Sequence, residues 1–483
     1  MSPSMPESAG STATIALLGL PIANLTPSEA VQRIELLARA GRRDGRMRQV
    51  ATANVDFLTT VHGFGWGEPR HAELLEVLRC ADLVTADGMP LVWLARLCGT
   101  PLAGRVTGAD LVPAIAAMAA KSNLTLFLLC CQSDEQAAQT TRSMESRFPG
   151  LRIVGYDASH VHVTGERLLD GPAADAGLIA RINAAQPDIV LVGFGHPKQE
   201  LWVARNRRRL KAGVAIGVGG SLEFLMGRVR RAPPWMQRAG LEWIYRISQQ
   251  PRRLWRRYAR GVLQLAALAI PLLVVGRQAR RARSTRGPGQ DGAAFRPTRL
   301  THADPLPEQL GSALDLSGLE RLDHNGLGQL LTHYQRARAG DPIAVVGAAP
   351  LQLRGWLRAN RMWDLLGEAL PTTWAPPASP EALGGQTLQA MAETGAKLCL
   401  PRWFDGPCAR ALAPAIAAQA AVHSLIIELQ AVRYIDAEAL AMLITWQRQY
   451  PERLVLASIP RNVQRALKVA DLAGAFAGGT GHR

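Results

Sequence analysis

The sequence predicts an α/β protein with three parts: a Rossmann-like parallel-sheet domain, a basic helical segment, and two small α/β modules. From residue 12 to about residue 220, short apolar runs alternate with amphipathic stretches, as is typical of buried parallel strands separated by helices. Cationic residues concentrate in the next segment, and a weak repeat occupies the rest. With 483 residues, 48% hydrophobic and 19% charged, the chain can bury several cores, which excludes wholesale disorder.

Apolar runs in the first domain predict its strands. Each run is short and ends at glycine or a polar residue, as the buried strands of a parallel sheet do. Ligands of such sheets bind at the carboxyl ends of the strands, so the loops that follow the runs form the candidate site. The runs are "TIALLGLPI", "QVATANV", "LTLFLLCC", "LRIVGYD", "DIVLVGFG" and "GVAIGVGG".

The loop "GFGHPKQE" follows one of these runs and opens a helix. Gly193 and Gly195 let the backbone approach a ligand closely, and the helix N-terminus favours anions. Lys198 and Gln199 offer a cation and an amide to a diphosphate or a sugar. A structural turn with solvated side chains is the alternative, and His196 is expected to be an ordinary loop histidine.

Two further loops carry polar residues. Asp87 lies in "ADGMP", where an Asp before Gly is most often a turn former. The functional alternative is a general base that removes a proton from an attacking sugar hydroxyl. The stretch "GRVTGADL" places Arg105, Thr107 and Asp110 at a predicted helix start, where Thr107 is equally plausible as an N-cap.

Several catalytic motifs are absent from the sequence. It has no D-x-D, no His/Cys cluster and no carboxylate cage, so we expect neither a metal nor a cofactor. It also lacks a GxSxG elbow, a Walker loop and a GxGxxG fingerprint; Gly219 and Gly220 lie in "GVGGSLE", which misses the dinucleotide spacing. Hydrolase, kinase and dehydrogenase functions are therefore not expected.

The positive charge of the protein is confined to one segment. Residues 205–286 hold 20 Lys and Arg against only two acidic residues, Glu223 and Glu242. This basic belt carries +18, and since the whole chain carries +16, the remainder is near −2. Such an excess is typical of proteins that bind nucleic acid, an anionic membrane or a phosphorylated ligand.

An apolar segment, residues 262–276, lies within this belt. Its fifteen residues fall short of the ~20 that a spanning helix needs, and Pro271 is expected to interrupt it. We favour an interfacial or re-entrant membrane anchor; a short span and a buried core helix are the alternatives. The N-terminus lacks a basic region typical of signal peptides, and the six cysteines lack disulfide spacing, so we expect cytoplasmic folding.

A weak internal repeat follows the belt. Residues 314–331 and 427–444 superpose with an offset of 113, which places Asp323 over Asp436 and predicts two related α/β modules. The expected divisions of the chain are 12–225 for the sheet domain, 226–260 for its basic appendage, 261–283 for the apolar segment, 284–298 for a linker, 299–370 for module 1, 371–386 for a second linker and 387–478 for module 2.

Five stretches of the chain resemble the WecG/TagA/CpsF glycosyltransferases, glycosyltransferase family 26. In order, they are "TANVDFL", "ADGMP", "RVTGADL", "PDIVLVGFGHPKQELW" and a long block beginning "GVGGSLEFLMGRVRRAPPWMQRAGLEWIYRISQQ". The resemblance covers residues 12–260. It implies an inverting, metal-independent enzyme that moves an N-acetylmannosamine-type sugar or a hexose from a UDP-sugar to a polyprenyl-diphosphate-linked glycan, for cell-surface polysaccharide synthesis. Members of this family reach the membrane with a basic C-terminal segment, and UDP-sugars are cytosolic. We therefore expect a peripheral or monotopic protein on the anionic cytoplasmic face of the plasma membrane.

The same resemblance implies roles for individual residues. Asp87 corresponds to the catalytic base, and Thr52, Asn54, Arg105 and Gln199 to polar residues around the sugar and diphosphate. Without a metal, arginines must neutralise the leaving diphosphate. The candidates in the basic appendage are Arg228, Arg230, Arg231, Arg246, Arg252 and Arg253.

The two C-terminal modules resemble STAS domains, the sulfate-transporter/anti-sigma-antagonist type. Where regulatory STAS domains carry a phosphoacceptor Ser or Thr, this chain has His324 and Ala437, so we expect docking or assembly rather than phospho-switching. A protein partner for these modules and a homo-oligomer are further expectations. The alternative functions are a catalytically inactive STAS-containing scaffold and a nucleic-acid-binding protein.

Overall fold

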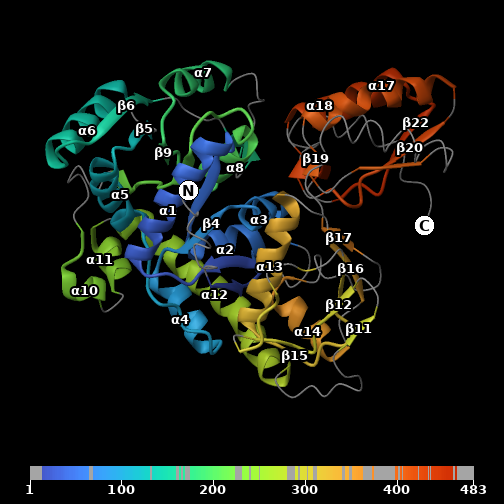
Figure 1. Cartoon of the computed structure of the whole chain (residues 1–483), viewed down its shortest axis with the longest axis horizontal. Coiled ribbons are helices and arrows are strands. Elements are labelled where there is room, and N and C mark those ends of the chain that lie inside the picture. The colour runs from blue at the N-terminus through green and yellow to red at the C-terminus, as the bar shows by residue number, and fades with distance from the viewer. Residues whose placement is uncertain are drawn as a thin grey trace, which may run out of the picture.

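The computed structural model places most of the chain (Figure 1). It describes residues 13–64, 69–130, 133–158, 163–164, 167–168, 175–222, 231–238, 241–249, 251–279, 289–291, 294–301, 303–307, 310, 313–339, 343–347, 351–362, 372–374, 397–400, 403–404, 406–422, 424–432, 434–435, 437–460 and 463–464.

A six-stranded parallel sheet forms the centre of the first domain, which confirms the predicted Rossmann-like α/β class. Five of the predicted runs lie in it, together with a strand from "ADLVTA". Every neighbouring pair is parallel, so all six carboxyl ends meet at one edge. The strand order is β4 (Leu83–Ala86), β3 (Arg48–Ala53), β10 (Val214–Gly217), β9 (Ile189–Gly193), β5 (Thr125–Cys130) and β6 (Arg152–Asp157).

Helices cover both faces of this sheet, and alternate side chains of the strands pack on each layer. One layer consists of α1 (Pro27–Asp44), α5 (Gly108–Ser122) and α6 (Asp134–Arg147). The other consists of α2 (Val55–His62), α3 (Ala72–Arg79), α4 (Met89–Leu97), α7 (Ala176–Ala185) and α8 (Lys198–Asn206). A short antiparallel pair, β7 (Val163–Thr164) and β8 (Arg167–Leu168), precedes α7.

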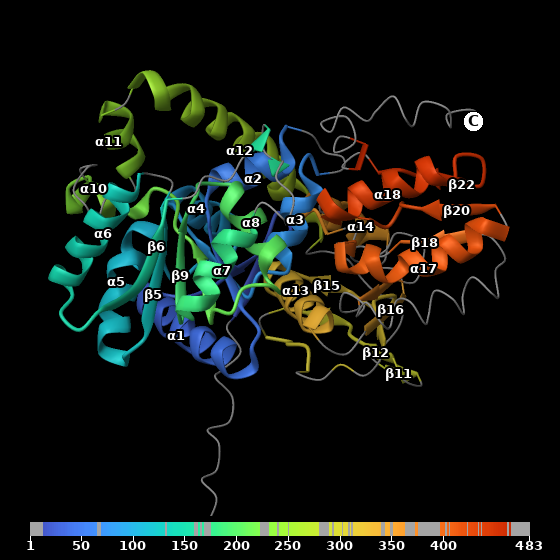
Figure 2. The same ribbon diagram turned by 90° about the horizontal axis from the view of Figure 1, so that it is seen from above.

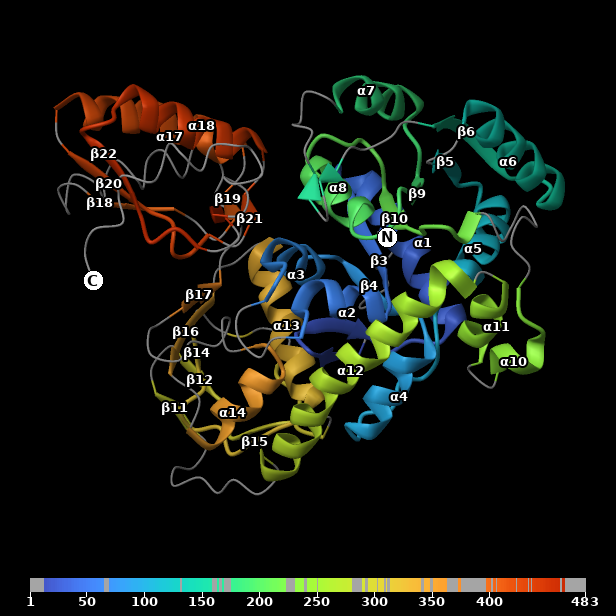
Figure 3. The ribbon, with the colours of Figure 1, turned by 180° about the vertical axis from the view of Figure 1, so that it is seen from behind.

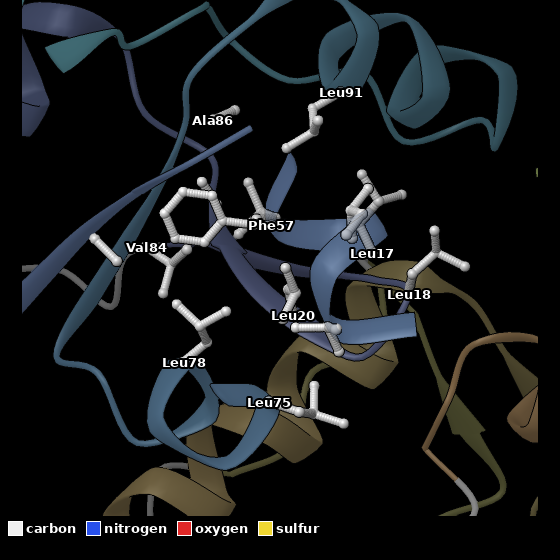
Figure 4. Packing of buried hydrophobic residues seen from close by; sticks show 14 of the residues in the cluster. Leu17, Leu18, Leu20, Phe57, Leu75, Leu78, Val84, Ala86 and Leu91 are labelled. Carbon is white, nitrogen blue, oxygen red and sulfur yellow. The ribbon is translucent and has the colours of Figure 1, made fainter. Parts of the chain in front are cut away.

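The first apolar run is not a strand of the parallel sheet, contrary to expectation. It folds into an antiparallel hairpin of β1 (Thr14–Leu17) and β2 (Leu20–Ala23), because Leu18 and Gly19 both adopt left-handed conformations that close a tight turn. The run looks like a buried parallel strand because it is covered on both sides. Figure 4 shows Leu17, Leu18 and Leu20 of this hairpin in one cluster with side chains of the sheet domain.

The basic appendage folds into helices. Two short ones, α10 (Pro234–Arg238) and α11 (Glu242–Gln249), are followed by the long α12 (Pro251–Ala279). The expected interruption at Pro271 is wrong, and the expected boundary between residues 260 and 261 falls inside α12. Leu268 and Leu272, on either side of the proline, are buried in the sheet domain's hydrophobic cluster, and this packing stabilises a helix that the proline alone would weaken.

Module 1 begins earlier than expected, because two strands lie in the predicted linker 284–298 and a third in 371–386. Its sheet runs β11 (Gly289–Asp291), β12 (Ala294–Arg296), β14 (Ala313–Asp315), β16 (Ile343–Gly347) and β17 (Thr372–Trp374). A separate parallel pair, β13 (Arg299–Leu300) and β15 (Arg321–Leu322), and two helices, α13 (His324–Ala339) and α14 (Leu351–Ala359), complete it.

Module 2 repeats the parallel strands, the separate strand pair and the helix that follows it, but it has a helix, α17, without a counterpart in the described residues of module 1. It has a parallel sheet of β18 (Lys397–Cys399), β20 (Leu425–Glu428) and β22 (Leu454–Ala457), a pair of β19 (Trp403–Phe404) and β21 (Tyr434–Ile435), and helices α17 (Gly406–Val422) and α18 (Ala437–Gln449). The shift from β15 to β21, and from the start of α13 to the start of α18, is the predicted 113 residues. Asp436 lies outside the described residues.

Module 1 docks directly onto the first part of the chain, chiefly through α13 on the hairpin and α14 on α12, as the views in Figures 2 and 3 agree. Side chains of α3 add hydrogen bonds to it. Arg79 is fully buried there and donates to the carbonyl oxygens of Gly19 (3.2 Å) and Arg361 (2.5 Å). His324 Nδ1 lies 2.7 Å from the carbonyl oxygen of Ala16. This buried polar interface joins the first strand of the chain to a module some 300 residues later, since the separation of the last pair is 308 residues.

Gly328 allows the closest approach at this interface. A Cβ at Gly328 would overlap the backbone of Thr14, so only glycine lets α13 lie against β1. We expect Gly328→Ala to force the two elements apart and lower the free energy of unfolding by about 1–3 kcal/mol, the usual cost of overpacking. Thermal unfolding measures this. Gly177→Ala is the matched control, because it also lies in a helix but its Cβ would meet nothing nearer than 3.7 Å; an equal loss in both variants would contradict the expectation.

Candidate functional site

The loops singled out from the sequence follow four adjacent strands. Asp87 follows β4, Asn54 follows β3, Gly219 lies after β10 and Gly195 after β9. Since these strands are neighbours and parallel, the four loops line one edge of the sheet, where open α/β sheets bind their ligands.

Gln199 joins two of these loops. Its side chain is only 3% exposed, and its Oε1 accepts hydrogen bonds from the backbone amides of Gly195 (3.2 Å) and Gly219 (3.0 Å). Its Nε2 donates to Glu200 Oε1 at 2.7 Å. A Cβ at Gly217 would lie 2.6 Å from Nε2, so the strand end must be glycine for the amide to enter. Gln199 therefore fixes the spacing of the two glycine loops, a positional role in addition to the ligand contact predicted for it.

Thr52 and Asn54 are also tied to the backbone. Thr52 is buried, and its hydroxyl donates to the carbonyl of Gly217 on the neighbouring strand (3.0 Å). Asn54 caps α2, because its Oδ1 accepts from the Asp56 amide at 3.0 Å. Both residues thus lie at the predicted edge, and their contact with a substrate stays a prediction.

The glycines of these loops have distinct reasons for being glycine. Gly195 and Gly219 have φ values of +83° and +50°, which other residues rarely adopt. A Cβ at Gly193 would lie 3.1 Å from the carbonyl oxygen of Leu129 and 3.3 Å from that of Gly219. Two further predicted residues, the half-buried Lys198 and the exposed Gly220, begin α8 and follow β10 respectively.

Asp87 is the most perturbed carboxyl group of the site. It is half-buried, and its Oδ2 accepts a long hydrogen bond, 3.4 Å, from the amide of Gly108 at the start of α5. Burial raises its pKa to about 6; the Gly108 amide and the charges of Arg246 and Arg105 oppose this rise, and Glu242 adds to it. Asp87 can therefore accept a proton near neutral pH.

Four charges of alternating sign form a connected group near this base, and we call them the charge ring. Arg105 Nη1 donates to Glu242 Oε2 at 2.9 Å, and Arg231 Nη1 donates to Asp110 Oδ1 at 2.7 Å. The cross pairs, Arg105 with Asp110 and Arg231 with Glu242, are each separated by 3.9 Å. The ring joins α5 of the sheet domain to α11 of the appendage. These contacts lower the pKa of Asp110 and raise that of Arg231, chiefly through their mutual hydrogen bond acting against burial.

Thr107 is the N-cap of α5, which agrees with one of the two interpretations of the sequence. Its hydroxyl accepts a hydrogen bond from the Asp110 amide at 3.1 Å.

The structure places only some of the predicted appendage arginines. Arg246 lies half-buried on α11, and Arg252 is exposed at the start of α12. Arg253 belongs to α12, but its side chain is not described, and Arg228 and Arg230 lie outside the described residues.

Sequence reasoning missed two acidic residues. One is Glu242, and the signal for it was its rarity, because the basic belt holds only two acids against 20 cations. The other is Glu200, which is buried. Its Oε2 lies 3.2 Å from Nδ1 of His196, whose ring stacks on Phe57 at a centroid distance of 3.8 Å.

In the part of the chain that the structure describes, no group of three or more His, Cys, Asp and Glu side chains is arranged to hold a metal ion. Metal independence therefore stays a prediction.

Comparison with known proteins gives consistent matches. The model of the "Glycosyl transferase WecG/TagA/CpsF family" matches residues 15–281. A protein of Bacillus spizizenii is 34% identical over 182 residues, 38% of this chain and 65% of the relative, so the chain spans just under two thirds of it. A protein of Staphylococcus aureus (strain MW2) is 28% identical over 254 residues, 52% of this chain and 90% of the relative. Both are named N-acetylglucosaminyldiphosphoundecaprenol N-acetyl-beta-D-mannosaminyltransferase.

The raised pKa of Asp87 predicts a pH-dependent stability. The folded protein holds this proton more tightly than the unfolded chain, so the cost of burying the carboxylate is present above pH 6 and vanishes below about pH 4. We expect Asp87→Asn to raise the melting temperature at pH 8 and to leave it nearly unchanged at about pH 3.5. The control is Asp134→Asn, at an exposed position in α6. A shift in melting temperature that is the same at both pH values would contradict the assignment.

Proposed function

Because the chain belongs to the WecG/TagA/CpsF family of glycosyl transferases, we propose that it transfers a sugar from a UDP-sugar to a polyprenyl-diphosphate-linked acceptor. The observation that carries this proposal is Asp87, a carboxyl group with a pKa of about 6 at the carboxyl edge of the sheet, beside arginines that suit a diphosphate. The relatives' names support an N-acetylglucosaminyl-diphosphate-undecaprenol acceptor and an N-acetylmannosamine donor. A hexose donor is the alternative.

The proposed reaction is a single displacement with inversion. Asp87 takes the proton of an acceptor hydroxyl as that oxygen bonds to the anomeric carbon of the donor sugar. The bond between that carbon and the diphosphate oxygen breaks at the same time, and UDP leaves with the bonding electrons. Arg105 and Arg231 neutralise the charge that develops on the diphosphate, a task for which the planar guanidinium is well suited.

We further propose that α12 rests on the membrane where such an acceptor resides. Within the described residues, one helix segment, Trp255–Val274, is long and apolar enough to cross a membrane by length and composition alone. One side of α12 packs against α2 and α14, as Figure 3 shows, and buries Leu268 and Leu272. The opposite side exposes a stripe consisting of Trp255, Val262, Leu263, Ile270 and Val274.

This two-sided arrangement favours a helix lying in the plane of the interface. A helix that spanned the bilayer would have to leave its contacts with α2 and α14. Exposed arginines, Arg252, Arg256 and Arg260, accompany the apolar stripe and suit anionic headgroups. Trp93 and Leu97 of α4 are likewise exposed, and α4 begins directly after Asp87 and Gly88. The buried faces of α4 and α12 share one hydrophobic cluster, which supports a common apolar surface near the base.

For the C-terminal modules we propose an assembly role. His324 occupies the position of the phosphoacceptor in the STAS domains that module 1 resembles, but it is only 4% exposed and bonded to the hairpin. A phosphate could not be added there without breaking the docking interface. Module 1 is thus better suited to hold the sheet domain and α12 together than to act as a phosphorylation switch.

Activity should depend on Asp87. With a UDP-sugar panel and a synthetic polyprenyl-diphosphate sugar, we expect Asp87→Asn to lower kcat about 10²–10⁴-fold, the usual contribution of a general base. In the unmodified enzyme kcat/KM should rise with pH through about 6, as the carboxylate forms, and the variant should lose this rise. Asp134→Asn should retain full activity. Transfer that is unaffected by Asp87→Asn would refute the base assignment.

Membrane binding should depend on the exposed side of α12. We expect the double variant Leu263→Glu, Ile270→Glu to abolish flotation with liposomes that contain anionic lipid, because both side chains are more than 60% exposed and their replacement leaves the core intact. Leu36→Glu, at an exposed position on α1, is the matched control. If the double variant floats as well as the control, α12 is not the membrane-binding element.

A further inference from the structure

The charge ring holds a carboxylate where the proposed reaction needs room for a diphosphate. Arg105 is the sheet-domain arginine that we propose neutralises the leaving diphosphate. Its Nη1, however, is already paired with Glu242 at 2.9 Å. Both side chains are only 15% exposed, so this ion pair is largely shielded from water. A diphosphate that bound Arg105 would have to compete with the negative charge of Glu242.

Arg231 shows that the ring is incompletely satisfied. Its Nη1 is bonded to Asp110, but its Nε and Nη2 are buried without any hydrogen-bond acceptor in the described part of the chain. Glu242 Oε1, at 3.9 Å from Nε, is too far away to accept. Buried guanidinium donors without acceptors are costly, and a diphosphate has enough oxygens to satisfy them together with Arg105.

The two acids of the ring differ in how firmly they are held. Asp110 lies in the first turn of α5, and its Oδ2 also accepts from the Thr107 hydroxyl at 2.7 Å. Glu242 is the first residue of α11, in an appendage that reaches the site from outside the sheet domain. Of the two carboxylates, Glu242 is therefore the one that can leave without disturbing a helix cap of the sheet domain.

We propose that Glu242 is an internal stand-in for the donor diphosphate: it neutralises Arg105 when the site is empty and is displaced when the donor binds. This inference rests on the proposed function. Displacement is favourable because a diphosphate brings more negative charge than one carboxylate and supplies acceptors to the two unpartnered donors of Arg231. The exchange also removes one tether between α11 and the sheet domain, so donor binding and the position of the appendage are coupled, and the coupling acts in both directions.

Binding of UDP and of inorganic pyrophosphate, each measured by calorimetry, tests the proposal. Glu242→Gln keeps the size of the side chain but removes the competing charge, so both probes should bind about three- to tenfold more tightly than to the unmodified protein, as expected for the loss of one competing charge. Glu35→Gln is the matched control, because it also breaks a Glu–Arg pair, with Arg39 on α1, and should change neither affinity. Melting temperatures establish that each variant is folded.

A second measurement separates a stand-in from a purely structural tether. The negative charge of Glu242 raises the pKa of Asp87, so Glu242→Gln should move the acid limb of the kcat/KM profile to lower pH. The loss of a purely structural tether would not produce this shift. Unchanged or weaker pyrophosphate binding by Glu242→Gln overturns the proposal, as does a lack of pyrophosphate binding by every variant.

The inference and the proposed function can fail separately. If Glu242→Gln tightens pyrophosphate binding while no UDP-sugar is a substrate, the stand-in holds and the donor assignment is wrong. If UDP-sugar transfer depends on Asp87 but Glu242→Gln leaves both affinities unchanged, the function holds and the stand-in is wrong.

Discussion

The candidate site depends on one buried amide. Gln199 accepts hydrogen bonds from two loops that follow neighbouring strands, and it can do so only because Gly217 leaves room at the end of β10. The parallel sheet brings the loops to one edge, but a sheet alone fixes only where each strand ends. The amide fixes the loops relative to each other, and with them the start of α8 and its anion-favouring N-terminus.

Opposing effects set the pKa of Asp87 at this edge, and burial is the largest of them. Arg105 and Arg246 would by themselves hold the pKa of Asp87 low, and a carboxylate of ordinary pKa would be a weaker base. Desolvation outweighs them and brings the pKa to about 6. The basic belt thus leaves the site with little excess positive charge, because Asp110 is paired with Arg231 of the belt and Glu242 with Arg105.

Periodicity and glycine placement predicted what is local. The five parallel strands and the loops at their ends were readable because a buried strand and its terminating glycine lie next to each other in the sequence. The hairpin and the continuity of α12 through Pro271 were not, because the packing that stabilises each of them comes from residues far along the chain. The strands in the expected linkers were not, because each is only three residues long and forms no apolar run. The Arg105–Glu242 pair joins residues 137 positions apart, and no spacing rule indicates it. The basic belt indicated a phosphorylated ligand and a membrane, but not which arginine would face which.

The docking of α13 on the hairpin also sets an order of events during synthesis. Ala16 and Ile15 leave the ribosome about 300 residues ahead of the parts of α13 that contact them, His324 and Gly328. At about 5–20 residues per second, this delay lasts roughly 15–60 s. Throughout that interval the side of the hairpin that α13 covers in the folded protein has no cover. A nascent chain of this protein therefore depends on protection of its own N-terminal strand until module 1 emerges.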